Sequence, residues 1–296
     1  MRNLWSAHIA LFIANLIYGV NYSVARIAMP EYIEAFGFVV LRATGAMLFF
    51  WMVHFFTERE SIAKADYFRF ALCGVFGVAI NQLFFLKGLS LSTPINAAII
   101  MTTNPIMVLL IANIIIKEKI TSTKVAGIFI GLTGALLLLC FKKDFSFGSD
   151  TMEGDIYVLI NSLSYAIYLL MVKELIQRYH PLTVVKWVFS FGLFFVLPFG
   201  LQEVLDADWN GFDVEIWGSI IFVVFVTTCA AYLLNTFALT KLTPSIASTY
   251  IYLQPMMATL FAIAMGKDDL DTIKVISTLI ILFGVYMVSK PIEVKE

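Results

Sequence analysis

Long apolar stretches separated by short polar segments run the whole length of the chain. With charge clusters, glycines and prolines taken as boundaries, the pattern predicts ten spans, at residues 5–27, 35–56, 68–88, 94–116, 122–141, 153–173, 183–202, 216–238, 244–266 and 272–289. A helix of about 20 residues is long enough to cross the ~30 Å hydrocarbon core of a membrane. The apolar positions are continuous rather than alternating, which favours helices over barrel strands. We therefore expect an all-α integral membrane protein with ten transmembrane helices.

Composition and charge narrow the class further. Hydrophobic residues make up 60% of the chain and charged residues 14%, with a mean hydropathy of +0.88, whereas soluble domains are about half apolar and a quarter charged. A net charge of −1 without a basic stripe excludes a nucleic-acid partner. Cys73, Cys140 and Cys229 stand alone, so neither a metal nor a cofactor is expected. The expected partners are membrane lipids and a small-molecule substrate, and the oligomeric state stays open.

The second half of the chain repeats the first. Thr93-Pro94 and Asn104-Pro105 recur as Thr243-Pro244 and Gln254-Pro255, a shift of 150 residues without a gap. Between residues 93 and 140, thirteen of 48 positions are identical to the residue 150 positions later: Thr93, Pro94, Ala97, Pro105, Met107, Leu110, Ala112, Lys117, Lys124, Val125, Ile130, Leu132 and Gly134. Internal repeats of this kind decide the fold. We predict two repeats of five helices, at residues 5–141 and 153–289.

Five spans per repeat is an odd number, so the second copy enters the bilayer in the opposite orientation to the first. Inverted repeats of this kind usually place the substrate near the membrane midplane, where interrupted helices meet. Pro105 and Pro255 are the interruptions in this sequence, because proline removes one helix hydrogen bond and crowds the preceding turn. We expect them to act as hinges. The alternative is a kink that only improves packing.

Lysine and arginine residues are unevenly shared between alternate loops. Thirteen fall on the side of the N-terminus and six on the other, counted over the predicted spans. The positive-inside rule then places both termini in the cytoplasm, and we expect a multi-pass protein of the cell inner (plasma) membrane.

Polar residues inside the predicted spans are the candidate site residues, since they are costly in lipid unless they face protein or water. Their spacing groups them on helix faces; for example, Asn161, Tyr165 and Tyr168 follow one another at i, i+4 and i+7. Amides and hydroxyls could hold both ends of a zwitterion, and the alternative is that they hold helices together. The predicted substrate-binding residues are Tyr18, Asn21, Asn81, Gln82, Thr103, Asn104, Asn161, Tyr165, Tyr168, Tyr232, Asn235, Tyr250 and Gln254.

Arg42 is the one basic residue well inside a predicted span, and it needs a partner there. It could be a structural lock, tied to carbonyls and hydroxyls, or it could bind a substrate carboxylate. The centres of the spans hold no Asp or Glu, and such groups usually carry the proton in coupled carriers. The pattern therefore favours facilitated diffusion or exchange over proton antiport.

Several motifs in order resemble those of a known family. They are Ile17-Tyr18-Gly19-Val20-Asn21, Leu41-Arg42, Leu89 to Asn104-Pro105, Lys117-Glu118-Lys119-Ile120-Thr121, Gly131-Leu132-Thr133-Gly134, Leu163 to Tyr168 and the copy from Leu239 to Gly284. This series is similar to the EamA domains of the drug/metabolite transporter superfamily. The resemblance implies a carrier with ten helices in two inverted repeats that exports amino acids or other small metabolites by alternating access.

The chain departs from many of these relatives at two places. It has Leu253-Gln254-Pro255 where they have Leu-Glu-Pro, and Tyr18 and Tyr165 where they often have Trp. A nucleotide-sugar or lipid-type carrier of the same fold is the alternative function. An intramembrane enzyme is a remote one, because His8, His54 and His180 lie apart, so we expect no enzymatic activity.

Overall fold

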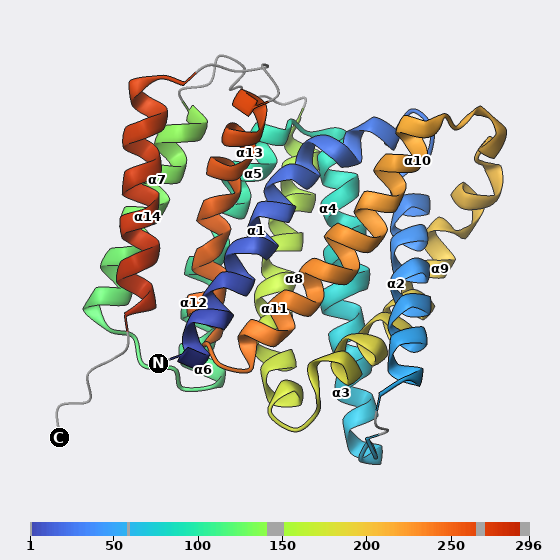
Figure 1. Ribbon diagram of the computed structural model, residues 1–296, viewed down its shortest axis with the longest axis horizontal. Helices are drawn as coiled ribbons and strands as arrows, with labels where there is room; N and C mark the ends of the chain where they lie inside the picture. Colours follow the sequence, from blue (N-terminus) through green and yellow to red (C-terminus); the bar gives the residue numbers. More distant parts are fainter. Residues whose placement is uncertain (1, 58–59, 141–150, 265–269, 291–296) are drawn as a thin grey trace.

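The structure, a computed structural model, describes residues 2–57, 60–140, 151–264 and 270–290. These residues form helices and no strand, and the helices stand side by side in one bundle (Figure 1). The helices are α1 (Arg2–Ala28), α2 (Ala35–Phe55), α3 (Lys64–Gly74), α4 (Ile80–Leu91), α5 (Pro94–Met101), α6 (Asn104–Ile115), α7 (Ser122–Cys140), α8 (Met152–Ile176), α9 (Pro181–Asp206), α10 (Val214–Ile221), α11 (Ala231–Leu239), α12 (Pro244–Thr249), α13 (Leu253–Ala264) and α14 (Thr272–Ser289). Short irregular helical segments link them: η1 (Val75–Ala79), η3 (Trp209–Gly211), η4 (Phe222–Ala230) and η5 (Tyr250–Tyr252).

The predicted spans correspond closely to these elements. Within the described residues, nine helices are long and apolar enough to cross a membrane. Three of the nine consist of joined elements. Helices α3, η1 and α4 form Lys64–Leu91, α5 and α6 form Ile95–Ile115, and α10, η4 and α11 form Val214–Leu239. The remaining predicted span, 244–266, is helical in three pieces, α12, η5 and α13, and its last two residues lie outside the described residues. The all-α membrane fold is therefore confirmed, with nine of the ten predicted spans observed as such helices.

The repeated Thr-Pro motif begins an equivalent helix in each half. The Thr93 hydroxyl accepts a hydrogen bond from the backbone N–H of Asn96 at 3.1 Å, and Thr243 does the same for Ile246 at 3.4 Å. Threonine is a good N-cap, and the proline that follows suits the first helical position because that N–H has no helical partner. Each motif therefore fixes where α5 or α12 begins.

The Asn-Pro and Gln-Pro motifs mark the points where these two spans break. Helix α5 ends at Met101 and α6 begins at Asn104, while the twin span passes through the tighter turn η5 before α13 begins at Leu253. Proline has no N–H for the carbonyl four residues earlier, so the carbonyls of Met101 and Ile251 lack their α-helical donors. The structure thus shows an interruption at each predicted position.

Elements of the first half pack against their counterparts in the second. Helix α7 packs on α14 and α2 on α9, and the two broken spans meet where α6 packs on α12. In Figure 1 the pairs α7–α14 and α2–α9 form the two sides of the bundle. The contact of α4 with α8 is matched by that of α11 with α1. This reciprocal pattern is expected of two repeats related by a pseudo-two-fold axis. We call residues that stand 150 positions apart twins.

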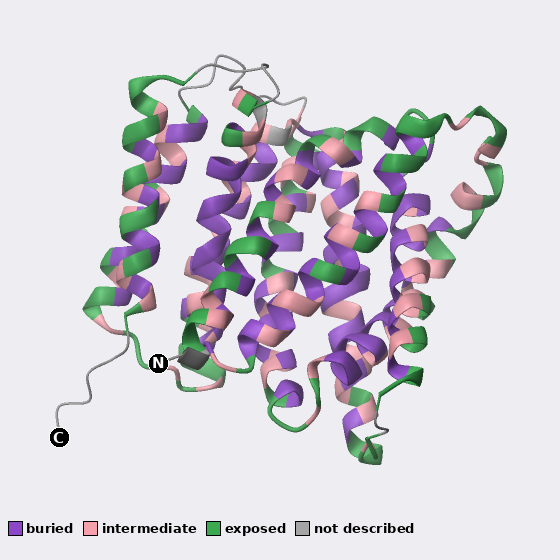
Figure 2. Cartoon of the chain, in the orientation of Figure 1, coloured by how far each residue is buried: buried purple, intermediate pink, exposed green. Residues whose placement is uncertain are grey.

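The outer faces of the bundle are apolar, as a membrane requires. Large side chains such as Phe129, Phe194 and Leu279 are more than half exposed, and exposed positions follow the outer face of α14 (Figure 2). Asparagine, glutamine and threonine side chains are instead buried inside. Helix α1 begins and α14 ends at the same end of the bundle (Figure 1). The exposed apolar surface supports a protein that spans a bilayer.

The close contact of α7 and α14 predicts a stability effect. A Cβ at Gly284 would lie 2.5 Å from the Gly131 backbone nitrogen, and two backbones cannot separate locally without cost. Gly284→Ala should lower the free energy of unfolding by about 1–3 kcal/mol, measured by thermal melting in detergent. Gly218→Ala is the matched control, because a Cβ at Gly218 meets nothing within 4 Å. Equal melting temperatures for the two variants would contradict this packing.

Candidate functional site

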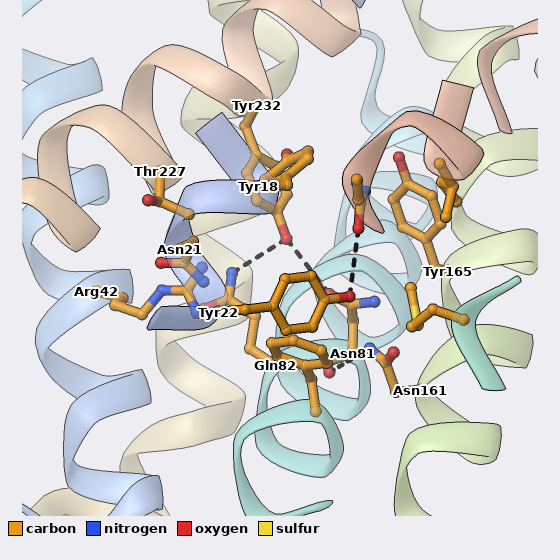
Figure 3. Close-up of a pocket in the computed structure, with 14 residues that line it drawn as sticks. Tyr18, Asn21, Tyr22, Arg42, Asn81, Gln82, Asn161, Tyr165, Thr227 and Tyr232 are labelled. Atoms are coloured by element: carbon orange, nitrogen blue, oxygen red, sulfur yellow. Dashed lines mark hydrogen bonds between the residues drawn. The ribbon is translucent and has the colours of Figure 1, made fainter. Parts of the chain in front are cut away.

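A pocket lined by polar and aromatic side chains lies between the two halves, near the middle of several helices. It has a volume of about 80 Å³ and is shown in Figure 3. Its lining residues come from α1, α2, α4, α5, α8, η4, α11, η5 and α13: Tyr18, Asn21, Tyr22, Arg42, Asn81, Gln82, Phe85, Met101, Asn161, Tyr165, Thr227, Tyr232, Ile251 and Gln254. Both repeats therefore contribute to one cavity.

Most of the residues predicted from sequence meet at this pocket. Arg42 lines it. So do eight of the thirteen candidate binding residues: Tyr18, Asn21, Asn81, Gln82, Asn161, Tyr165, Tyr232 and Gln254. The candidates come from helices far apart in the sequence, so the polar faces of separate spans do converge.

The other five candidates lie outside the lining. The Thr103 hydroxyl donates to the Ile100 carbonyl at 2.7 Å, and Asn104 Nδ2 donates to the Ser162 carbonyl at 2.7 Å. Tyr168 packs its ring on Gly77, Asn235 Nδ2 donates to the Tyr18 hydroxyl at 3.1 Å, and the Tyr250 hydroxyl lies 2.7 Å from His8 Nδ1. Asn235 supports a lining residue and Thr103 closes the turn at the end of α5, whereas Asn104, Tyr168 and Tyr250 hold neighbouring elements together.

Sequence reasoning missed five lining residues: Tyr22, Phe85, Met101, Thr227 and Ile251. Three of them are apolar, and an apolar residue in an apolar span gives no signal by itself. Met101 and Ile251 are twins, however, and each stands four residues before the proline of its broken span. The repeat could therefore have pointed to these two.

The hydroxyl of Tyr232 joins the two halves at the centre of the pocket. Gln82 Nε2 donates to it at 3.2 Å, and it donates to the Gly77 carbonyl at 3.1 Å, with Asn81 Oδ1 at 3.4 Å. Gln82 and Tyr232 are twins, so this bond links equivalent positions across the pseudo-two-fold axis. Gly77 lies in η1, a π-helical segment whose twin is η4, and such segments often occur at functional sites. The axis thus passes through the pocket.

A second chain of hydrogen bonds positions Gln254. The Tyr22 hydroxyl donates to Gln254 Oε1 at 3.3 Å, and Gln254 Nε2 donates to Asn15 Oδ1 at 2.9 Å. Asn15 Nδ2 in turn donates to the Leu11 carbonyl at 2.8 Å. A backbone carbonyl only accepts, so this last bond sets the orientation of both amides. The pocket wall between α1 and α13 is therefore held in one arrangement.

Arg42 is 4% exposed and has a neutral partner. Its Nε donates to Thr228 Oγ1 at 3.0 Å, and the Thr228 hydroxyl donates to the Val223 carbonyl at 2.7 Å. Among the described residues no carboxylate lies within ion-pair distance of Arg42, and none lines the pocket. The guanidinium is thus both anchored through Nε and part of the cavity wall.

The described residues contain no cluster of His, Cys, Asp or Glu that could hold a metal ion.

The Tyr232 network gives a prediction. Tyr232→Phe removes three hydrogen-bond contacts and leaves the buried Gly77 carbonyl and Gln82 amide without this partner. The free energy of unfolding should fall by about 1–2 kcal/mol, seen as a lower melting temperature in detergent. Tyr286→Phe, on an exposed face of α14, is the matched control and should melt like the unmodified protein. A Tyr232→Phe variant with unchanged stability would show that the network contributes little.

Comparison with known proteins shows which family shares this architecture. The EamA-like transporter family matches residues 5–140 and again residues 152–290. An uncharacterized transporter of Archaeoglobus fulgidus is 23% identical over 285 residues, which cover 95% of this chain and 96% of the relative. Uncharacterized transporter YetK of Bacillus subtilis is 22% identical over 97% of this chain and 88% of its own. A solved crystal structure with 16% identity shares the fold, with a TM-score of 0.78 over 96% of both chains. This chain therefore belongs to the EamA-like transporter family of membrane proteins.

Proposed function

We propose that the protein is a secondary transporter that carries small metabolites, above all amino acids or related compounds, outward by alternating access. The observation that carries this proposal is one cavity near the middle of the helices, lined by polar and aromatic residues from both repeats. Inverted-repeat carriers hold their substrates at such a position, and one half rocks against the other around the site. The lining residues are the substrate-binding residues of this proposal.

The size and charge of the cavity favour a small cargo. On the scale where one water needs roughly 10–15 Å³, a cavity of about 80 Å³ holds roughly six waters, which suits a small amino acid. A nucleotide sugar or a lipid is far larger, and its phosphates would require a cluster of cations. Among the described residues, Arg42 is the one cation in the lining. These features weigh against the nucleotide-sugar or lipid-type alternative.

The lining bears on whether transport is coupled to protons, and the charges of the loops bear on the orientation of the protein in the membrane. Because no carboxylate lines the pocket among the described residues, we propose facilitated diffusion or exchange rather than proton antiport. The excess of lysine and arginine on the side of the N-terminus favours a plasma-membrane protein with both termini in the cytoplasm. The common end of α1 and α14 (Figure 1) agrees with two termini on one side.

The broken spans supply the moving parts in this proposal. Each break, between α5 and α6 and at η5, has a lining residue at its edge, Met101 or Ile251. A change in the angle at a break would therefore move a wall of the cavity, with Pro105 and Pro255 as the hinges.

Reconstituted transport tests the proposal directly. Proteoliposomes should show saturable counterflow of at least one of labelled alanine, serine, threonine, valine and leucine, at the same rate with and without a pH gradient. Met101→Trp fills the cavity and should abolish this uptake, whereas Met152→Trp, at an exposed position, should not. Uptake of none of the five would contradict amino-acid transport, and a strict need for a pH gradient would contradict the uncoupled mechanism.

The hinges can be tested by restoring the helix hydrogen bonds. The double variant Pro105→Ala, Pro255→Ala gives each break the N–H that proline lacks, so transport should slow several-fold while the protein still inserts in the membrane. Pro198→Ala is the control, because Pro198 lies within the unbroken helix α9. Transport at the full rate by the double variant would refute the hinge hypothesis.

A further inference from the structure

Four buried polar atoms in the pocket lining lack a partner among the described residues: Asn21 Oδ1, Gln82 Oε1, Asn161 Oδ1 and Thr227 Oγ1. Their residues are at most 4% exposed. Leaving a buried acceptor without a donor is costly, so such atoms usually mark a site whose function needs them. Three of the four are amide oxygens, which only accept hydrogen bonds. Each of the four atoms has less than 1 Å² of accessible surface, so a ligand in the cavity reaches it only after the side chain turns toward the cavity.

The structure fixes which end of two of these amides is free. Asn161 Nδ2 donates to the Asn81 carbonyl at 2.7 Å, and a backbone carbonyl cannot donate in return. Gln82 Nε2 donates to the Tyr232 hydroxyl, whose own proton is directed to the Gly77 carbonyl or to Asn81 Oδ1. In both residues the nitrogen is engaged and the oxygen remains. These assignments follow from the hydrogen-bond network rather than from the atoms' appearance.

The broken helices add acceptor character to the same pocket. Met101 is the last residue of α5, and Ile251 lies in η5, just before the break in the twin span. The C-terminal end of a helix carries partial negative charge on its unpaired carbonyls, and interrupted helices use such ends to bind cations. The carbonyls of both residues have lost their α-helical donors to Pro105 and Pro255, and the Ile251 carbonyl accepts from the backbone N–H of Leu253 instead. The Met101 end of α5 therefore favours a cationic donor.

Arg42 gives the pocket the opposite character at another point. In Figure 3, Arg42 lies at one side of the pocket and Asn161 and Tyr165 lie at the other. The twin of Arg42 is Gly192, where a Cβ would lie 2.6 Å from Val78. The second half therefore has no matching cation. Although the two repeats are related by pseudo-symmetry, the positive charge of the cavity lies at one side, with Asn21 and Thr227 beside it, and Asn161 lies at the other side.

We propose that the pocket is a two-part site in which Arg42 binds a carboxylate and the oxygens of Gln82 and Asn161, with the C-terminal end of α5, bind a primary ammonium group. The cargo then needs both groups on one small molecule, and the site discriminates against 2-oxo acids, which lack the N–H donors. This inference rests on the proposed function, because it assigns roles within the same cavity. Gln82 and Asn161 are its specificity-determining residues.

Matched ligands test the two parts separately. The purified full-length protein in detergent is titrated with series built on the side chains of alanine, valine and leucine, and its thermal stabilisation is measured. Each series contains the amino acid, the 2-hydroxy acid, the 2-oxo acid and the decarboxylated amine. Where the amino acid binds, the 2-oxo acid should bind about tenfold to a hundredfold more weakly, the usual value of a hydrogen bond to a charged group. The amine should also bind weakly, because it leaves Arg42 unpaired.

Variants distinguish a specific role from a structural one. Asn161→Leu and Gln82→Met remove the acceptors, so the preference for the amino acid over the 2-oxo acid should disappear. Arg42→Gln should instead remove the preference for the amino acid over the amine. Asn104→Leu is the control, because Asn104 is a buried amide that also bonds a carbonyl but lies outside the pocket. Its ligand preference should stay that of the unmodified protein, even if its melting temperature falls.

The outcomes also separate this inference from the proposed function. Equal binding of an amino acid and its 2-oxo acid, or an unchanged preference in Asn161→Leu and Gln82→Met, would overturn the ammonium site while leaving a carrier possible. No stabilisation by any ligand of the three series would overturn it as well. Selective binding of amino acids without any uptake in proteoliposomes would support the two-part site and reject the carrier.

Discussion

Hydrogen bonding in hydrocarbon is the constraint on which this structure depends. A backbone or side-chain polar group in the membrane core has no water to bond, so irregular backbone is tolerated there only where it is buried in protein or lines a cavity. The two proline-broken spans and the two π-helical segments meet that condition, since they face the interior of the bundle. Tyr232 bonds the Gly77 carbonyl of η1, and Thr228 bonds the Val223 carbonyl of η4. The cavity is thus the place where the irregular backbone of both halves is accommodated.

The repeat explains why one cavity forms, and the positions at which the two repeats differ make the two ends of the cavity unequal. Twin residues such as Gln82 and Tyr232 meet across the axis because the two halves have the same fold in opposite orientations. Identical residues at each position would give a site with two equivalent ends. The pairs Arg42 with Gly192 and Asn104 with Gln254 break that equivalence, because Arg42 and Gln254 line the pocket and their twins do not.

Much of the fold could be predicted from the sequence, because hydropathy alone determines which segments lie in the membrane. The predicted boundaries of α7, 122–141, and of α14, 272–289, agree with the structure to within one residue. The π-helical segments could not be predicted, because their apolar residues fit an ordinary helix equally well. For the site, polar residues in apolar spans were a good guide, as with Asn161 and Gln254, but polarity could not distinguish Asn81, which lines the pocket, from Asn104, which holds α6 to α8. That difference depends on helix rotation, which tertiary packing sets.

Access to the cavity from each side of the membrane is the most direct test of alternating access. Thr227 lines the pocket and is small, so Thr227→Cys can be placed in a protein whose Cys73, Cys140 and Cys229 are replaced by alanine. An impermeant thiol reagent is then added to right-side-out and to inverted membrane vesicles. Labelling of the new cysteine from both sides, slowed by a transported amino acid in each case, is the predicted result. Labelling from one side only, or equal labelling with and without that amino acid, would contradict a carrier that exposes this cavity alternately to the two sides.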